Sequence, residues 1–386
     1  MDVTGIDSTG WEVFNKSGRS RVVVTKMLPG KEWLDFLLEA DYRVEVNTSR
    51  AITEKEELIE RIGSNCKAVI GQLTENWDSE LFRILGAAGG KAYCNYAVGF
   101  NNVNVEAATE NNIAVGNTPG VLTETSAEMA LALTMACARR IVEADNFTRA
   151  GNFDGWLPDL FLGNRLWRGT VGIIGVGRIG AAYALLMVRA FQMDLKYFSP
   201  RKNADLENEI DSYNNYLRKI NCDPVKYERT DSVEELLKAA DVVSLHTPLN
   251  ESTHHLITCD RLSMMKPEAI LINTSRGPVI DEIALTKHCK DNRGFKAGLD
   301  VFEDEPVIHA DMKKLSNVTI TPHIASSTRW TREGMARLAA LNVIGILENY
   351  PASEGINVNR FLEKHPPKAI PSIVNAASLK TLLKTL

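Results

Sequence analysis

The chain has 386 residues, which is long for one hydrophobic core and suits two domains of ordinary size. Its apolar and charged fractions are those of a globular protein, and the net charge of -5 gives no reason to expect nucleic acid or an anionic membrane as partner. The six cysteines form no CxxC pair, so we expect reduced thiols in an intracellular compartment and no metal site. No apolar run approaches the roughly 20 residues of a membrane span.

The N-terminal part alternates between strand-like and helix-like patterns. Residues 21–25, 42–46 and 68–70 predict strands, and 33–38 and 55–62 predict helices between them. This alternation predicts a parallel sheet with helices packed on it, and such sheets bind ligands at the carboxyl ends of their strands. Two loops lie at such ends, residues 71–74 and Asn95-Tyr-Ala-Val-Gly-Phe-Asn-Asn102. The second is either a polar turn or a loop whose backbone N–H groups bind a small carboxylate.

A long helix is predicted next. Thr125, with Glu128 three residues later, matches a capping box that opens a helix reaching about Arg149. Apolar residues surround this helix, which predicts that a subunit interface covers it. The turn Asn117-Thr-Pro-Gly120 is the expected crossing into a second domain.

The sequence Thr170-Val-Gly-Ile-Ile-Gly-Val-Gly-Arg-Ile-Gly180 predicts a dinucleotide site. Residues 171–174 form a buried-strand pattern and 178–188 an Ala-rich helix. Gly175 permits the turn between them, Gly177 leaves room for a pyrophosphate, and Gly180 lets the helix pack against the strand. A bare GxGxxG also fits an ordinary turn, but the strand before it and the helix after it favour the cofactor.

The following strand should end in the residue that binds the adenosine ribose. An Asp or Glu there would accept a hydrogen bond from the 2′-hydroxyl, but this chain has Ser199, with Arg201 and Lys202 just beyond. Serine does not repel a 2′-phosphate and two cations attract one, so we expect NADPH to be used as well as NADH. The alternative is that both cations belong to a solvated turn. Residues 203–230 predict a helical insertion.

Four further strands, predicted at 241–246, 269–273, 297–299 and 318–320, each end in polar residues. Arg276, Glu305 and His323 among them supply the functions that reduction of a 2-oxo acid requires. A guanidinium can pair with the substrate, an imidazolium can donate a proton as hydride arrives, and a carboxylate keeps that imidazole charged. Singly they also fit a surface arginine, one acid in an acidic run and a histidine capping a strand.

The motifs Gly175-Val-Gly-Arg-Ile-Gly180, Asn273-Thr-Ser-Arg-Gly277, Asp300-Val-Phe-Glu-Asp-Glu-Pro306 and Thr321-Pro-His323 resemble, in this order, those of the D-2-hydroxyacid dehydrogenase family. The wider match resembles the plant-type hydroxypyruvate (glyoxylate) reductases of photorespiration. It rests on the loop 95–102 and on Gly116-Asn-Thr-Pro-Gly-Val-Leu-Thr-Glu-Thr125, Trp156-Leu-Pro158, Trp330-Thr-Arg-Glu-Gly334 and Pro371-Ser-Ile-Val-Asn375. The resemblance implies NAD(P)H-dependent reduction of hydroxypyruvate to D-glycerate and of glyoxylate to glycolate.

The resemblance also implies an α/β fold of two Rossmann-like/flavodoxin-like domains with parallel sheets. A discontinuous substrate-binding domain would comprise 1–117 plus 324–386, and a dinucleotide-binding domain 118–323, with the active site in the cleft between them. His323 would be the acid/base, Glu305 its support and Arg276 a substrate ligand. The implied cofactor residues are Gly175, Gly177, Arg178, Ile179, Gly180, Ser199, Arg201, Lys202, His246, Thr247, Pro248, Thr274, Asp300 and Thr123. The implied substrate residues are Leu73, Ala97, Val98 and Gly99, with Arg276 and His323.

Two features depart from the plant-type pattern. Those enzymes have an aspartate where Ser199 stands, and they end in Ser-Lys-Leu, a peroxisomal address, whereas this chain ends in Leu383-Lys-Thr-Leu386. The acidic N-terminus is unlike a signal or transit peptide. We expect an intracellular organelle or the cytosol: the peroxisome is usual for these enzymes, and the mitochondrion and cytosol are alternatives.

A different class of function uses the same fold. Corepressors in which dinucleotide binding controls partner recruitment also keep the Arg, Glu and His, and turnover of hydroxypyruvate would distinguish them from an enzyme. Formate dehydrogenases, another branch, have a glutamine where Glu305 lies, so Glu305 disfavours formate oxidation.

Overall fold

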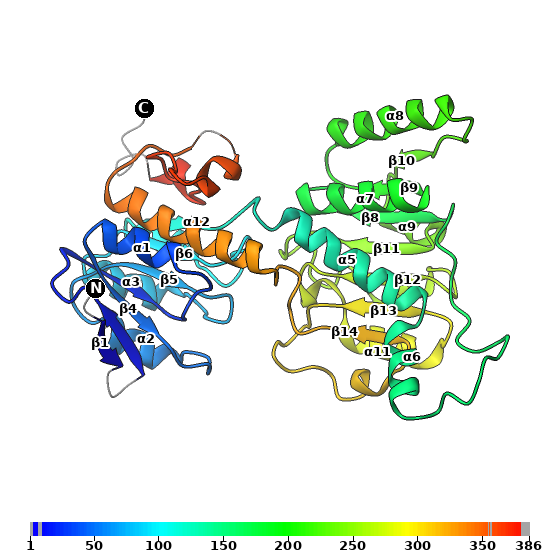
Figure 1. Ribbon diagram of the computed structural model, residues 1–386, viewed down its shortest axis with the longest axis horizontal. Helices are drawn as coiled ribbons and strands as arrows, with labels where there is room; N and C mark the ends of the chain where they lie inside the picture. Colours follow the sequence, from blue (N-terminus) through cyan, green and yellow to red (C-terminus); the bar gives the residue numbers. More distant parts are fainter. Residues whose placement is uncertain (1–2, 7–9, 354, 356, 380–386) are drawn as a thin grey trace. The chain divides into compact units, whose positions relative to one another are not determined.

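The computed structural model describes residues 3–6, 10–353, 355 and 357–379, which form two compact units (Figure 1). Unit 1 comprises Met1–Leu122 and Ser327–Leu386, and unit 2 comprises Thr123–Ser326. The divisions therefore come a few residues after the expected positions 117 and 323. The C-terminal residues Leu383 to Leu386, on which the expected location partly rests, lie outside the described residues.

Unit 1 contains a seven-stranded sheet in the order β1-β2-β4-β3-β5-β6-β7. The strands are β1 (Val3–Ile6), β2 (Trp11–Phe14), β3 (Ser20–Val24), β4 (Tyr42–Asn47), β5 (Cys66–Gly71), β6 (Ala92–Asn95) and β7 (Ala114–Gly116). The pairs from β4 to β7 are parallel, as predicted. At one edge β1 and β2 add two antiparallel strands that were not predicted.

Helices from both ends of the chain pack on this sheet. They are α1 (Glu32–Glu39), α2 (Lys55–Ile62), α3 (Ser79–Ala87), α4 (Val105–Glu110) and α12 (Arg329–Leu347), followed by the short 3-10 helices η3 (Val358–Leu362) and η4 (Ala376–Ser378). Helix α12, orange in Figure 1, contacts α1 and the strands β5 and β6. The C-terminal residues thus complete a domain that the N-terminal residues begin.

Unit 2 contains a second seven-stranded sheet, in the order β10-β9-β8-β11-β12-β13-β14, and all its neighbours pair in parallel. The strands are β8 (Thr170–Ile174), β9 (Asp194–Phe198), β10 (Tyr227–Arg229), β11 (Val242–Leu245), β12 (Ile270–Asn273), β13 (Lys296–Leu299) and β14 (Val318–Ile320). The strand order reverses between β8 and β11, and ligands of such sheets bind at the carboxyl ends near this reversal.

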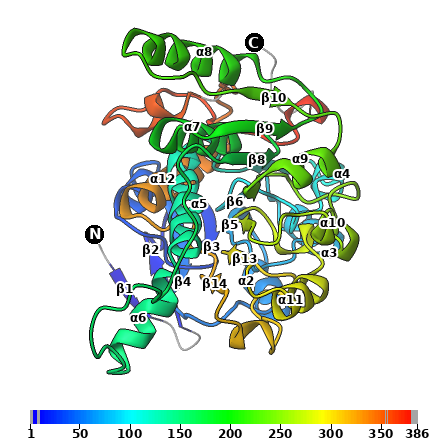
Figure 2. The same cartoon turned by 90° about the vertical axis from the view of Figure 1, so that its right-hand side faces the viewer.

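Helices cover both faces of the second sheet. They are α5 (Thr123–Ala138), α6 (Ile141–Arg149), α7 (Arg178–Phe191), α8 (Ala204–Lys219), α9 (Val233–Ala239), α10 (Cys259–Ser263) and α11 (Glu282–Asp291), with the 3-10 helices η1 (Gly277–Val279) and η2 (Met312–Lys314). One hydrophobic core lies beneath α5, α7 and α8 and a second beneath α9, α10 and α11. Figure 2 shows α5 running beside α7.

The predicted helix from Thr125 to Arg149 is two helices. Helix α5 already begins at Thr123, so the predicted capping box at Thr125 is wrong. Arg140 adopts a left-handed conformation with φ 52°, which separates α5 from α6. Glu124, Glu128 and Ala132 are exposed at intervals of four residues, so α5 has one solvent-facing side and is not apolar all round.

No helix in the described part of the chain is long and apolar enough to cross a membrane. All six cysteines are free thiols, and four of them are buried.

Candidate active site

The glycine loop of unit 2 joins β8 to α7 in the geometry that the motif predicts. Gly175 has φ +93°, and a Cβ on it would lie 2.7 Å from the carbonyl oxygen of His246. A Cβ on Gly180 would lie 2.1 Å from the Gly175 carbonyl oxygen, so α7 packs this closely only with glycine there. A Cβ on Gly177 would meet nothing within 4 Å. The loop thus has open space ahead of the first N–H groups of a long helix, where a pyrophosphate fits.

Two further features of unit 2 fit a bound dinucleotide. The hydroxyls of Thr247 and Thr274, which follow β11 and β12, are buried without a hydrogen-bond partner in the described chain. Burying an unpaired hydroxyl is unfavourable, and a ligand lying along this edge of the sheet would supply the missing partners. The ring of His246 is held by Ser244, with 2.8 Å between Nε2 and Oγ, and desolvation lowers the pKa of His246 to about 3. This histidine is therefore a neutral hydrogen-bonding group.

The other expected cofactor residues lie on the same unit. Arg178 and Ile179 begin α7, Thr123 begins α5, and Pro248 is exposed just beyond β11.

The end of β9 carries the expected cations and one that the sequence did not reveal. Ser199 follows the strand directly, and exposed Arg201 makes no hydrogen bond or ion pair within the described residues. Lys202 is paired with Glu207, with 2.7 Å between Nζ and Oε2. Arg229 donates from Nε to the Ser199 carbonyl at 3.0 Å. The signal for Arg229 was weak because it lies at the end of a three-residue strand, 30 positions away in sequence.

Arg276, Glu305 and His323 follow β12, β13 and β14, three neighbouring strands of one sheet. The Nδ1 atom of His323 lies 2.8 Å from Oε2 of Glu305, and the other carboxylate oxygen accepts the N–H of Phe302 at 3.0 Å. Desolvation raises the pKa of Glu305, but the His323 hydrogen bond and charge, the Phe302 N–H and Arg276 outweigh it, so the pKa is lowered. The carboxylate is therefore charged beside the imidazole.

Arg276 is desolvated, which lowers the pKa of its guanidinium, while the charge of Glu305 opposes this shift. Its Nη1 donates to the carbonyl of Ser275 at 2.6 Å. The next residue, Gly277, lies so close to the backbone of Phe302 that a Cβ there would be 1.8 Å from its carbonyl carbon. This contact fixes the segment that carries Arg276 against the segment that carries Glu305.

Asp300 holds the turn that carries His323. Its buried carboxylate accepts the Thr321 hydroxyl at 2.5 Å and the N–H groups of Ile324 and Ala325 at 2.8 and 2.7 Å. Its carbonyl accepts the N–H of His323, which has a left-handed φ of 52°. A carboxylate has about four acceptor positions, so one remains for the nicotinamide contact that the resemblance implies.

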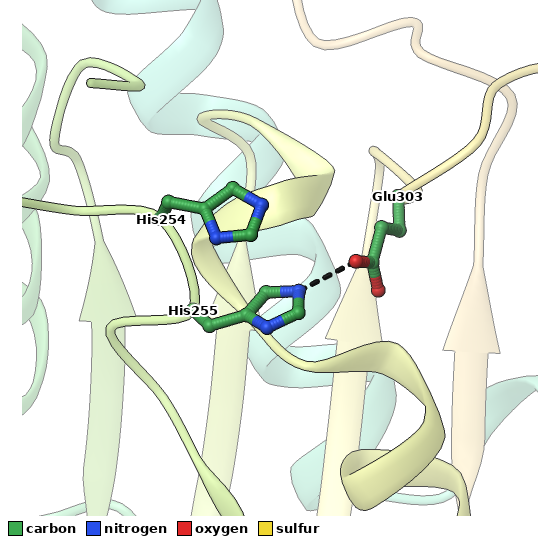
Figure 3. A group of neighbouring side chains, drawn as sticks. All are labelled: His254, His255 and Glu303. Atoms are coloured by element: carbon green, nitrogen blue, oxygen red, sulfur yellow. Dashed lines mark hydrogen bonds and ion pairs between the residues drawn. The ribbon is translucent and has the colours of Figure 1, made fainter. Parts of the chain in front are cut away.

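One group in the described chain has the composition of a metal site, namely His254, His255 and Glu303 (Figure 3). The Nε2 atom of His255 is 2.5 Å from Oε1 of Glu303, and the two imidazole rings stack with centroids 4.1 Å apart. Zinc bonds to nitrogen and oxygen are each about 2 Å long, so two ligands of one ion normally stand further apart than 2.5 Å. We therefore interpret the contact as a hydrogen bond that fixes the 303 segment.

The expected substrate residues of unit 1 lie on two loops. Leu73 is on the loop after β5, and Ala97, Val98 and Gly99 are on the loop after β6. Within the described residues, the N–H groups of Val98 and Gly99 have no acceptor, whereas their carbonyls accept from the side chains of Asn117 and Asn95, both at 2.8 Å. The loop therefore presents two unpaired N–H donors, which suit a small carboxylate.

Comparison with known proteins identifies the family. Residues 131–325 match the D-isomer specific 2-hydroxyacid dehydrogenase, NAD binding domain. Over 372 residues the chain is 53% identical to a glycerate dehydrogenase of Cucumis sativus, covering 95% of this chain and 97% of that protein. The chain belongs to the D-isomer specific 2-hydroxyacid dehydrogenases. The resemblance indicated by the motifs is thereby confirmed, and unit 2 contains the NAD-binding domain of the family.

Further relatives and one solved structure extend the comparison. A peroxisomal glycerate dehydrogenase of Arabidopsis thaliana is 52% identical, covering 95% of this chain and 96% of its own. A glyoxylate reductase of Thermococcus litoralis is 40% identical over 84% of this chain and 93% of its own. A crystal structure of a Thermus thermophilus protein superposes with a TM-score of 0.75 at 39% identity, covering 85% of this chain and 97% of that one.

A second solved structure contains ligands. It is an NADPH-dependent glyoxylate/hydroxypyruvate reductase of Sinorhizobium meliloti in complex with NADP and malonate, with a TM-score of 0.70 and 25% identity, covering 88% of this chain and 97% of that one.

Proposed function

We propose that this 2-hydroxyacid dehydrogenase uses NAD(P)H to reduce hydroxypyruvate to D-glycerate and glyoxylate to glycolate. The observation that carries the proposal is the trio at the ends of β12, β13 and β14, with His323 bonded to the charged Glu305. It lies on the sheet that also carries the glycine loop. The relatives named glycerate dehydrogenase and glyoxylate reductase support the same pair of substrates.

Each residue of the proposed site has a separate role in the reaction. NAD(P)H, held by the glycine loop and by the hydroxyls of Thr247 and Thr274, would supply a hydride to the carbonyl carbon of the substrate. The Arg276 guanidinium pairs with the carbonyl and carboxylate side of the substrate and orients it for that transfer. His323 donates a proton to the carbonyl oxygen as negative charge develops there, and the carboxylate of Glu305 stabilises the charged ring and fixes its orientation. The N–H groups of Val98 and Gly99 bind the substrate carboxylate.

The cofactor preference follows from the end of β9. Serine at 199 leaves no negative charge against a 2′-phosphate, and Arg201 and Arg229 bring two positive charges to the same turn. Lys202 contributes less because Glu207 neutralises it. We therefore propose that NADPH is used at least as well as NADH, through a charge-assisted contact to the 2′-phosphate.

We also propose a homodimer and an organellar or cytosolic location. The segment after α5 exposes seven large apolar side chains, an area that a second subunit would bury. They are Ile141, Val142, Phe153, Trp156, Leu157, Leu162 and Trp167. This segment replaces the all-round apolar helix as support for a dimer. The peroxisomal relative of Arabidopsis thaliana supports the proposed location.

Steady-state rates with the four combinations of hydroxypyruvate or glyoxylate and NADH or NADPH test the proposal. We expect turnover of both substrates, with NADPH at least as effective as NADH. Absence of turnover with all four combinations, while a dinucleotide still binds, would instead indicate a binding protein in which the dinucleotide controls partner recruitment.

A further inference from the structure

Beneath the two proposed substrate loops of unit 1, a partly buried hydrogen-bond network connects one loop to the other. The side chain of Asn102 donates from Nδ2 to the carbonyl of Gln72 at 3.1 Å and to the carbonyl of Glu75 at 2.9 Å. Its carbonyl oxygen Oδ1 accepts from Nδ2 of Asn95 at 3.1 Å, and Asn95 also donates to the carbonyl of Gly99 at 2.8 Å. One amide group thus connects both ends of the 71–77 loop to the 95–102 loop.

The carboxyl group of Glu75 closes the first loop from below. Its Oε2 accepts the N–H of Gln72 and the indole N–H of Trp77, each at 3.1 Å. The residue is only 3% exposed, and burial raises the pKa of Glu75 to about 7. Burial of a carboxyl group costs solvation free energy, and the hydrogen bonds that Glu75 makes offset this cost.

The backbone of the two loops is joined as well. The N–H of Trp77 donates to the carbonyl of Asn102, and the N–H of Asn104 donates to the carbonyl of Trp77, both at 2.8 Å. Gln72, which bonds to both Asn102 and Glu75, directly precedes Leu73, and Gly99 itself accepts from Asn95. A shift of Asn102 or Glu75 would therefore change where Leu73 and Gly99 lie.

We propose that Asn102 and Glu75 are positioning residues for the substrate carboxylate, because together they set the spacing of the 71–77 and 95–102 loops. The inference rests on the proposed function, in which Val98 and Gly99 bind that carboxylate. Neither residue touches the reacting atoms, so their loss weakens binding of the 2-oxo acid and leaves the acid/base step intact. Cofactor binding belongs to unit 2 and is unaffected.

Steady-state kinetics of four variants test this assignment. Asn102→Asp keeps the acceptor and the size but loses the two N–H donors, and Asn102→Ala loses every side-chain hydrogen bond of Asn102. For both we expect kcat/KM for hydroxypyruvate to fall roughly 10- to 100-fold because the KM for hydroxypyruvate rises. The value of kcat and the KM for NADPH should change less than about threefold. Glu75→Ala should behave in the same way. Glu75→Gln keeps an acceptor for Gln72 and Trp77 and should retain most of the affinity.

Asn76→Ala is the matched control, since Asn76 is an exposed asparagine of the same loop, and its KM should equal that of the wild type. A merely structural role for Asn102 and Glu75 would lower the fraction of folded enzyme, and hence kcat, at unchanged KM. Variants that fold and keep the wild-type KM for hydroxypyruvate would overturn the inference while the proposed function stands. A wild type that reduces neither hydroxypyruvate nor glyoxylate would overturn the proposed function, and the inference with it.

Discussion

His323 depends on residues outside its own strand for its position. Glu305 fixes the ring and Asp300 fixes the backbone turn. We expect His323→Ala to lower kcat roughly 10²- to 10⁴-fold, the range for removal of an acid/base group, while dinucleotide binding persists. His365→Ala, at an exposed histidine of unit 1, is the control and should be unchanged. Near-normal turnover of His323→Ala would remove this residue from the mechanism.

For Arg276, we expect the shape of the guanidinium to matter as well as its charge. Arg276→Lys keeps a cation but cannot make a planar two-pronged contact. We expect a fall in kcat/KM for hydroxypyruvate nearly as large as that caused by His323→Ala. The measurement is kcat/KM with saturating cofactor, and an unchanged value would assign Arg276 to the structure of the loop instead.

The protonation of Glu75 should make the stability of unit 1 depend on pH. Its pKa is raised from 4.5 to about 7 in the folded protein, so its contribution is fully present below pH 4.5 and is lost as pH rises through 7. That loss amounts to about 3 kcal/mol. Glu75→Gln cannot ionise, so its melting temperature relative to the wild type should increase between pH 5 and pH 8. A difference that stays constant across this range would show that the carboxyl group is not held protonated.

Among the elements, we propose that the edge formed by β9 and β10 determines the preference between NADH and NADPH. Ser199→Asp adds an acceptor for the ribose hydroxyl and a charge that repels a 2′-phosphate, so it should shift preference toward NADH. Arg229→Ala and Arg201→Ala should each reduce use of NADPH, by about 1 to 3 kcal/mol in kcat/KM, and added salt should reduce the wild-type preference. A strongly NADH-specific wild type, with a cofactor ratio that Arg201→Ala leaves unchanged, would make these cations an ordinary solvated turn.

The elements differ in how well the sequence predicted them. The strands β3, β4, β5, β8 and β11 to β14 and the helices α2 and α7 have clear periodicity, so their patterns sufficed. The strands β6 and β7 were not predicted, and β10 lies within residues 203–230, which were predicted as a helical insertion. The prediction of one long helix was wrong because Arg140 adopts a left-handed conformation that its residue type does not indicate. The predicted start was wrong because the pattern of Thr125 and Glu128 also occurs inside a helix. Asn102, Glu75 and Arg229 act through contacts between distant loops and strands, which spacing along the chain does not reveal.

For the molecule as a whole, a homodimer would cover the apolar segment that follows α5. Trp156 is 82% exposed and stands among six other exposed apolar side chains. Trp156→Lys together with Leu157→Lys should shift the protein toward a monomer in sedimentation analysis, because a buried charge without a partner opposes association. The control is Tyr216→Lys, at an exposed aromatic residue on α8, which should leave the sedimentation unchanged. A wild type that sediments as a monomer at all concentrations contradicts the dimer.

We infer that His323, Glu305 and Arg276 carry out the reduction of a 2-oxo acid by a hydride from NAD(P)H. The most direct test follows the oxidation of NADPH by hydroxypyruvate and identifies the product by a chiral assay, for the wild type and for His323→Ala at the same occupancy of cofactor. We predict one D-glycerate formed for each NADPH oxidised by the wild type and little product from the variant. A wild type that binds NADPH but forms no glycerate, or a variant that forms it at the same rate, would contradict the account.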